Sequence, residues 1–275
     1  MFSLTLIALS VAAVPSSWHT DYDRATWQAQ REKKDLVIYF RDQGELDDVL
    51  KEDEVQRRLS RFVCLRLPIS YKYKDERLLD HSALVDMLGR PGLVVVSYHD
   101  KELPFYGEVI SAHPYVGSRY RWVPGYGTEE LVTILDLPPT ATLTQRSMIY
   151  AVRVHPARPR SILARLHPAF LRHAERHSQR QARLRNQHHA DIIAASSRLQ
   201  EEVGDGIGPA SEVVAESWGS FVGGETVLEA AFSCVDAWRH SSGHWGAVSR
   251  THRYTGFDIA RAENGTWYAT GIFAD

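Results

Sequence analysis

Cysteine is scarce in this sequence, which excludes two kinds of chemistry. The 275 residues include only Cys64 and Cys234, and no pair has the CxxC spacing of zinc ligands or of dithiol redox sites. Both lie within apolar segments, RFVCLRLPI and AAFSCVDAW, and this favours two buried thiols over a disulfide between such distant positions. We therefore expect no thiol–disulfide exchange.

A hydrophobic run long enough to span a membrane is also missing. The apolar stretch over residues 2–14 is shorter than the roughly 20 residues of a membrane-spanning helix, and small residues follow it. This pattern is typical of a secretory signal peptide over residues 1–16, so we expect a secreted or periplasmic protein. A buried first strand or helix is the alternative interpretation.

Charge of one sign is not in excess, because the net charge is only −2, and no DNA- or RNA-reading motif is present. Nucleic acid is therefore not an expected partner. Lysine ends at Lys101, whereas arginine and histidine continue, and the paired prolines of LPPTAT stiffen the chain near residue 140. We expect a first domain over residues 17–137, a linker over 138–147 and a second domain over 148–275.

The first domain alternates strand and helix patterns. Short apolar runs predict strands over residues 35–40, 62–67 and 93–98, and a helix over 82–88 ends at Gly89. Strands that alternate with helices predict an α/β domain with a partly parallel sheet.

The segments DLVIYF, RFVCLRL and GRPGLVVVSYHDKE, in this order, resemble the thioredoxin-like superfamily over residues 18–136. The resemblance implies an α/β thioredoxin-like domain with a cis-proline at Pro91, and a reactive CxxC after the first of these strands. That stretch reads RDQGELDD and holds no sulfur, so we expect a structural or partner-binding domain. A cation site at Glu45, Asp47 and Asp48 is the alternative, although acids at a helix start commonly interact with the helix dipole.

Helix patterns dominate the second domain until its last segment. Amphipathic stripes predict helices over residues 169–184 and 226–238. Asn264-Gly265 between two strand patterns, residues 256–262 and 266–273, predicts a β-hairpin. Helices and strands that are not interleaved predict an α+β domain.

Three segments of this half, AERHSQRQA running to His188-His189, VAES and VDAWRHSSGH, resemble the CAP/SCP family of mostly secreted proteins over residues 147–275. The resemblance implies an α-β-α sandwich with a cleft formed by His189, Glu216 and His244. His188 could replace His189, since adjacent residues near a helix end point in different directions. The chain departs from the family at Ser217, which stands where an asparagine is usual. Residues 239–241, Arg-His-Ser, occupy the region of a second acid.

Two imidazoles and a carboxylate could hold zinc with an open position for water, or could move protons near neutral pH. We expect side-chain nitrogens of His244 and of His188 or His189 within about 8 Å of each other, near enough for one metal ion or bridging water. Zinc on His189 and His244 would be weakly held and lost below about pH 6.5. A purely structural role for each side chain is the alternative.

No motif pairs a nucleophile with these groups, so the expected function is that of an exported, non-catalytic binding protein. The alternative is a metal-assisted hydrolase that acts on extracytoplasmic peptide or cell-wall material. Nine arginines and one acid, Glu175, lie between Arg153 and Arg185. This run could bind an anionic envelope component, although such runs are more often the solvated side of a helix.

Overall fold

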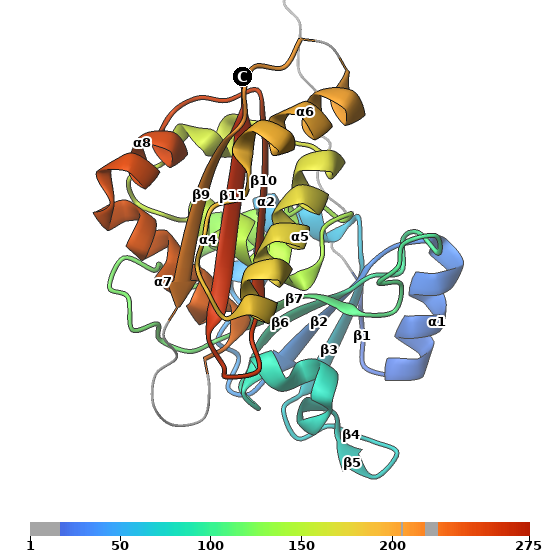
Figure 1. The fold of residues 1–275 in the computed structure, drawn as a ribbon. Helices are drawn as coiled ribbons and strands as arrows, with labels where there is room; N and C mark the ends of the chain where they lie inside the picture. The colour runs from blue at the N-terminus through green and yellow to red at the C-terminus, as the bar shows by residue number, and fades with distance from the viewer. Residues whose placement is uncertain (1–16, 205, 218–224) are drawn as a thin grey trace, which may run out of the picture.

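The computed structural model describes residues 17–204, 206–217 and 225–275. The expected signal peptide, residues 1–16, lies outside the described residues. The chain builds a five-stranded sheet followed by a four-stranded sheet, each with helices on its faces (Figure 1). A two-stranded ribbon of β4 (Lys72–Tyr73) and β5 (Glu76–Arg77) lies beside the first sheet.

The strands of the first sheet lie in the order β1-β3-β2-β6-β7. Their bounds are β1 Trp18–His19, β2 Leu36–Arg41, β3 Val63–Pro68, β6 Gly92–Val96 and β7 Val109–Pro114. β1 and β2 pair with β3 in parallel, whereas β6 is antiparallel to β2 and to β7. The sheet is therefore mixed, as the alternation of strands and helices predicts.

Both faces of this sheet are covered, because successive residues of β2 point to opposite sides. Leu36, Ile38 and Phe40 pack with one group of helices, and Val37 and Tyr39 pack with another. The first group is α1 (Tyr22–Glu32), η2 (Leu78–Asp80) and η3 (Ser82–Met87); the second is η1 (Val49–Lys51), α2 (Asp53–Leu59) and α3 (Thr128–Leu135). The helix expected over 82–88 is thus a 3₁₀ segment.

The entry into β6 differs from what the thioredoxin resemblance implies. No cis peptide bond occurs among the described residues, so the bond before Pro91 is trans. The chain instead turns through Gly92, whose φ is 148° and whose Cβ, if present, would lie 2.2 Å from the carbonyl oxygen of His113. The expectation of a cis-proline is wrong, and at Gly92 the absence of a side chain allows the close approach of β6 to β7.

The second sheet has the order β8-β10-β11-β9. Its strands are β8 Arg165–Leu166, β9 Ser211–Ser217, β10 Tyr254–Arg261 and β11 Trp267–Ala274. β10 and β11 form the hairpin predicted from Asn264-Gly265, and Gly265 takes the positive φ of 90° that such a turn requires. β9 adds antiparallel to β11, and β8 pairs in parallel with β10.

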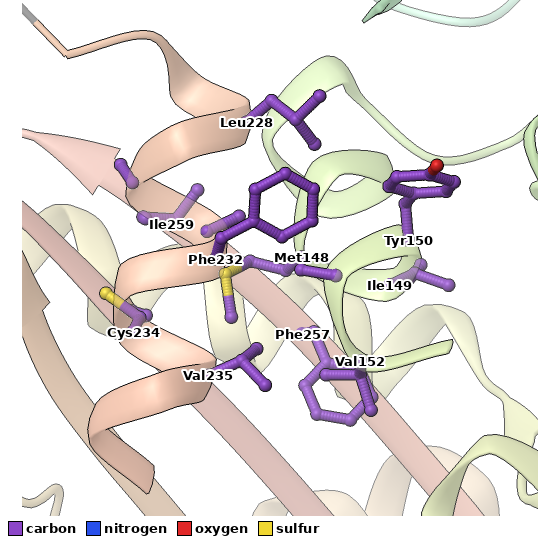
Figure 2. Close-up of a cluster of buried hydrophobic side chains, with 14 of the residues drawn as sticks. Met148, Ile149, Tyr150, Val152, Leu228, Phe232, Cys234, Val235, Phe257 and Ile259 are labelled. Carbon is purple, nitrogen blue, oxygen red and sulfur yellow. The ribbon is translucent and has the colours of Figure 1, made fainter. Parts of the chain in front are cut away.

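Helices cover both faces of this sheet and give a helix–sheet–helix sandwich (Figure 1). On one face are α5 (Pro168–Leu184) and α6 (Ile192–Val203); on the other are α4 (Leu143–Arg153), η4 (Arg160–Leu163), α7 (Val227–His240) and α8 (Ser242–Ser249). Figure 2 shows Met148 of α4 and Phe232 of α7 close to Ile259 of β10. The expected second helix and the hairpin therefore share one core.

The expected linker, residues 138–147, is partly helical. α4 begins at Leu143 with a capping box between Thr142 and Gln145, so residues 143–147 belong to its first turns. Arg146 of α4 is buried and donates from Nε to Ser111 Oγ of β7 at 2.7 Å. α4 therefore ties the first sheet to the second.

Candidate functional site

Three polar side chains of α5 face the second sheet at helical spacing. His173, His177 and Gln181 are four residues apart, so they lie on one side of the helix, and all three are buried. The rings of His173 and His177 are stacked with centroids 6.4 Å apart. Gln181 Nε2 donates to Thr270 Oγ1 of β11 at 3.0 Å, which fixes this side of α5 against the sheet.

The loop after α5 is held by the same side chains. His177 Nε2 donates to the carbonyl oxygen of His188 at 2.8 Å, and the amide of His188 donates to Gln181 Oε1 at 3.3 Å. Because a carbonyl only accepts, His177 carries its proton on Nε2. The His188 ring lies against His177 with centroids 5.1 Å apart, so it is part of this support.

Glu212 of β9 is the centre of the cluster. Its side chain is only 2% exposed, and Oε1 accepts from the amide of Ala190 at 2.8 Å and from His189 Nδ1 at 3.2 Å. Nε2 of His173 lies 3.7 Å from Oε2, and Nε2 of His177 lies 3.7 Å from Oε1. Burial alone would raise the pKa of Glu212, but the surrounding histidines and the Ala190 amide outweigh it and hold that pKa below its usual value.

His189 and His244 meet at the surface. Their ring centroids are 5.8 Å apart, and the His189 side chain is 55% exposed. Because Nδ1 of His189 donates to Glu212, the neutral ring carries its acceptor on Nε2. The structure thus brings two of the expected site residues together on segments far apart in the sequence.

His244 lies in a different part of a helix from the one expected. α7 ends at His240, a new helix begins at Ser242, and His244 lies in the first turn of α8. The helix dipole disfavours a cation there, whereas the sequence placed His244 after a helix C-terminus. Burial and the neighbouring His189 lower the pKa of His244, which favours its neutral form.

Glu216, expected between the two rings, is elsewhere. It lies on β9 opposite Tyr268, whereas Glu212 lies opposite Ile272. Among the described residues, Glu216 makes no hydrogen bond or ion pair with a histidine, and Glu212 makes the contact to His189. Sequence reasoning missed Glu212, His173 and His177; polar residues every four positions in the stripe of α5 were the available signal for the last two.

The cluster offers few donors to a metal ion. In the part of the chain that the structure describes, no group of three or more His, Cys, Asp or Glu side chains is arranged to hold a metal. Glu212 Oε1 is used by His189 and Ala190, and His177 Nε2 by His188. The exposed His189 and the half-buried His244 could supply two imidazole nitrogens, which fits a weak zinc site with positions open to water or ligand.

The acidic cluster after β2 is locally paired. Asp47 bonds Arg41 at 2.9 Å, Asp48 bonds Lys51 at 2.9 Å, and Glu45 accepts from the amides of residues 43 and 44. Each of the three carboxylates therefore already has an ion-pair or hydrogen-bond partner within the chain. Cys64 and Cys234 are both buried, as their apolar surroundings predict.

Part of the arginine run is neutralised. Arg172 and Arg176 of α5 both approach Glu202 of α6, and Arg185 pairs with Glu263. A hollow of about 500 Å³ beside the end of α5 is lined by Arg183, Arg185 and Arg261 together with Glu263. At the C-terminal end of α5, three arginines and one glutamate give this hollow a net positive charge.

A comparison of the sequence with protein-family models and with curated proteins finds no match. Among the described residues, none of the helices is both long and apolar enough to cross a bilayer.

Proposed function

We propose that this chain is an exported binding protein, with a thioredoxin-like first domain that lacks redox cysteines and a CAP/SCP-like second domain that binds the ligand. The first assignment is supported by the order β1-β3-β2-β6-β7, in which β6 alone runs antiparallel to the other four strands. The second is supported by the helix–sheet–helix layers and by the histidines near its surface.

One observation carries the functional proposal: Glu212, His189 and His244 form a chain of contacts from the interior to the surface. A buried carboxylate that accepts from Nδ1 of an imidazole fixes the orientation of the ring and leaves Nε2 as the free acceptor. Such a ring, next to a second imidazole kept neutral by burial, binds a metal ion or a hydrogen-bond donor. The ligand would then bind at this histidine pair, either through a zinc ion held by the two rings or through a hydrogen-bond donor of its own.

A zinc titration by isothermal calorimetry tests the site. At pH 7.5 we expect one weak zinc site in the wild type and in His240→Gln, the matched control, whose side chain is 75% exposed. His244→Gln should weaken zinc binding at least tenfold, and at pH 5 protonation should remove it from all variants. Equal zinc binding by His244→Gln and His240→Gln would rule out the pair as the site.

A metal-assisted hydrolase is the second candidate, and the Glu212–His189 contact favours it because the same arrangement orients zinc ligands in hydrolytic sites. Zinc-dependent cleavage of labelled casein or peptidoglycan that disappears in Glu212→Gln and persists in the exposed control Glu201→Gln would select this candidate. The arginines at the end of α5 make an anionic envelope component the proposed partner in either case.

A further inference from the structure

A second candidate binding site lies far along the chain from the histidine pair, in a cavity of about 240 Å³. Its lining residues come from the segments just before β2 and β3, from the end of α3 and from α4. The cavity therefore lies at the junction of the two sheets. Its wall combines apolar side chains, Phe62, Leu135, Leu137 and Pro139, with several charged groups. That combination suits a ligand with an apolar body and a charged end.

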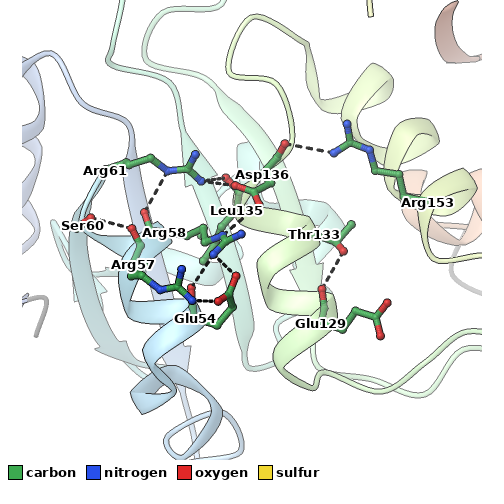
Figure 3. A network of polar contacts seen from close by, with 10 residues as sticks. All are labelled: Glu54, Arg57, Arg58, Ser60, Arg61, Glu129, Thr133, Leu135, Asp136 and Arg153. Carbon is green, nitrogen blue, oxygen red and sulfur yellow. Dashed lines mark hydrogen bonds and ion pairs between the residues drawn. The ribbon is translucent and has the colours of Figure 1, made fainter. Parts of the chain in front are cut away.

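The charge on the wall is predominantly positive. Four cations, Lys33, Lys34, Arg61 and Arg146, face two acids, Asp35 and Asp136. Figure 3 shows Arg58 and Arg61 both reaching Asp136, at 3.1 and 2.5 Å, so the charge of Asp136 is already balanced. Lys34 Nζ lies 3.3 Å from Glu32 outside the wall, so Lys33 and Arg146 are the two cations left facing Asp35, and the cavity keeps an excess of positive charge.

Arg146 is the most buried of these cations, at 1% exposure, and its partners are neutral. It donates to Ser111 Oγ and to the carbonyl oxygens of Leu137 and Pro138 at 2.7 to 3.2 Å. Burial, opposed by Asp35 and assisted by Arg153, lowers the pKa of Arg146 to about 9. A buried cation without a directly bonded carboxylate favours an anion beside it.

Asp35 and His99 supply a fixed polar edge. Asp35 Oδ1 accepts from the amides of Tyr98 and His99 at 2.9 and 3.1 Å, and from His99 Nδ1 at 2.8 Å. Three donors on one oxygen hold the carboxylate, and the bond to Nδ1 turns the opposite Nε2 edge of His99 away from Asp35. The ring therefore presents one defined hydrogen-bonding position beside the cationic wall.

We propose that this cavity binds a small organic anion, with its charged head beside Lys33, Lys34 and Arg146 and its apolar body against Phe62, Leu135 and Leu137. Carboxylates and phosphate monoesters share this chemistry. The cavity volume suits a body of about one ring, because ligand pockets for drug-sized molecules begin near 300 Å³.

Amide NMR titrations of the full chain with benzoate, phenyl phosphate, benzamide and inorganic phosphate test the proposal. Benzoate or phenyl phosphate should shift the amides of Phe62, His99 and Leu135 with saturation, and the tighter of the two identifies the preferred head group. Benzamide, which lacks the charge, and inorganic phosphate, which lacks the body, should each bind at least tenfold more weakly.

The variant for this test is the double substitution Lys33→Gln and Lys34→Gln at the cavity rim, where neither side chain is fully buried. It should weaken binding of the better ligand at least fivefold, whereas Lys51→Gln, an exposed lysine paired with Asp48, should not change it. The proposal is overturned by an absence of saturable shifts, by equal binding of either control compound, or by equal affinity in the two lysine variants.

Discussion

Asp258 is a buried carboxyl group whose protonation should set part of the pH dependence of stability. It is 1% exposed on β10, and it accepts hydrogen bonds from Thr144 Oγ1 of α4 at 2.7 Å and from Ser178 Oγ of α5. Burial raises the pKa of Asp258 to about 7, helped by Glu175 and opposed by the two hydroxyl groups. The carboxyl is thus neutral in the folded protein at mildly acidic pH.

The size and sign of the effect follow from this shift. The pKa rises from 3.8 to about 7, and each unit is worth about 1.4 kcal/mol, so ionisation costs the folded state about 4 kcal/mol. Above pH 4 the unfolded chain releases this proton and the folded chain retains it, so the contribution to stability falls as pH rises to 7 and is constant beyond. Between pH 5 and pH 8 the loss is about 3 kcal/mol by this linkage.

The substitution Asp258→Asn keeps the size and zero charge of the protonated carboxyl group but leaves no group to ionise. Urea unfolding followed by tryptophan fluorescence should show the variant gaining about 3 kcal/mol relative to wild type between pH 5 and pH 8. Glu263→Gln, at an exposed carboxylate, should show no such change and serves as the control. Parallel pH profiles for wild type and Asp258→Asn would refute the reasoning.

Three further predictions concern packing and buried polar groups. Gly256→Ala should cost about 2 kcal/mol or more in the free energy of unfolding, because its Cβ would lie 2.3 Å from the backbone of Phe170; Gly246→Ala, with open space around it, is the control, and equal urea midpoints would contradict the prediction. Cys234 is fully buried and burial raises the pKa of its thiol, so iodoacetamide should label it only after unfolding, and rapid native labelling seen by mass spectrometry would contradict this. Arg146→Met should cost about 3 kcal/mol in the free energy of unfolding, because Ser111 Oγ and three carbonyl oxygens lose their donor. Arg180→Met, at an exposed position, should be near neutral, and similar melting temperatures for the two variants would count against the account.

Secondary structure was predictable from the sequence where the local residue pattern agrees with the burial of the element in the fold. The apolar run of β2 predicts a strand buried on both faces, and Asn264-Gly265 predicts the β10–β11 hairpin. The start of α4 was also readable, since Thr142 and Gln145 have capping-box spacing. The paired prolines before it favour a linker over residues 138–147, whereas α4 begins at Leu143 within that range.

The site was less predictable because it depends on strand register. Glu212 and Glu216 are four residues apart on β9, so they share a face, and local sequence does not say which one lies level with the loop after α5. The pairing of β9 with β11 puts Glu212 opposite Ile272, and the contacts with Ala190 and His189 follow from that placement. The break between α7 and α8 likewise depends on Ser241, which caps α8 and places His244 in its first turn.

The contact between Glu212 and His189 is the basis of the proposed function, and the tautomer of the His189 ring tests it most directly. Long-range ¹H–¹⁵N NMR spectra of the histidine rings at pH 8 should show His189 with its proton on Nδ1, and zinc should shift Nε2 of His189 together with a nitrogen of His244. A His189 ring protonated on Nε2, with neither ring responding to zinc, would contradict the account.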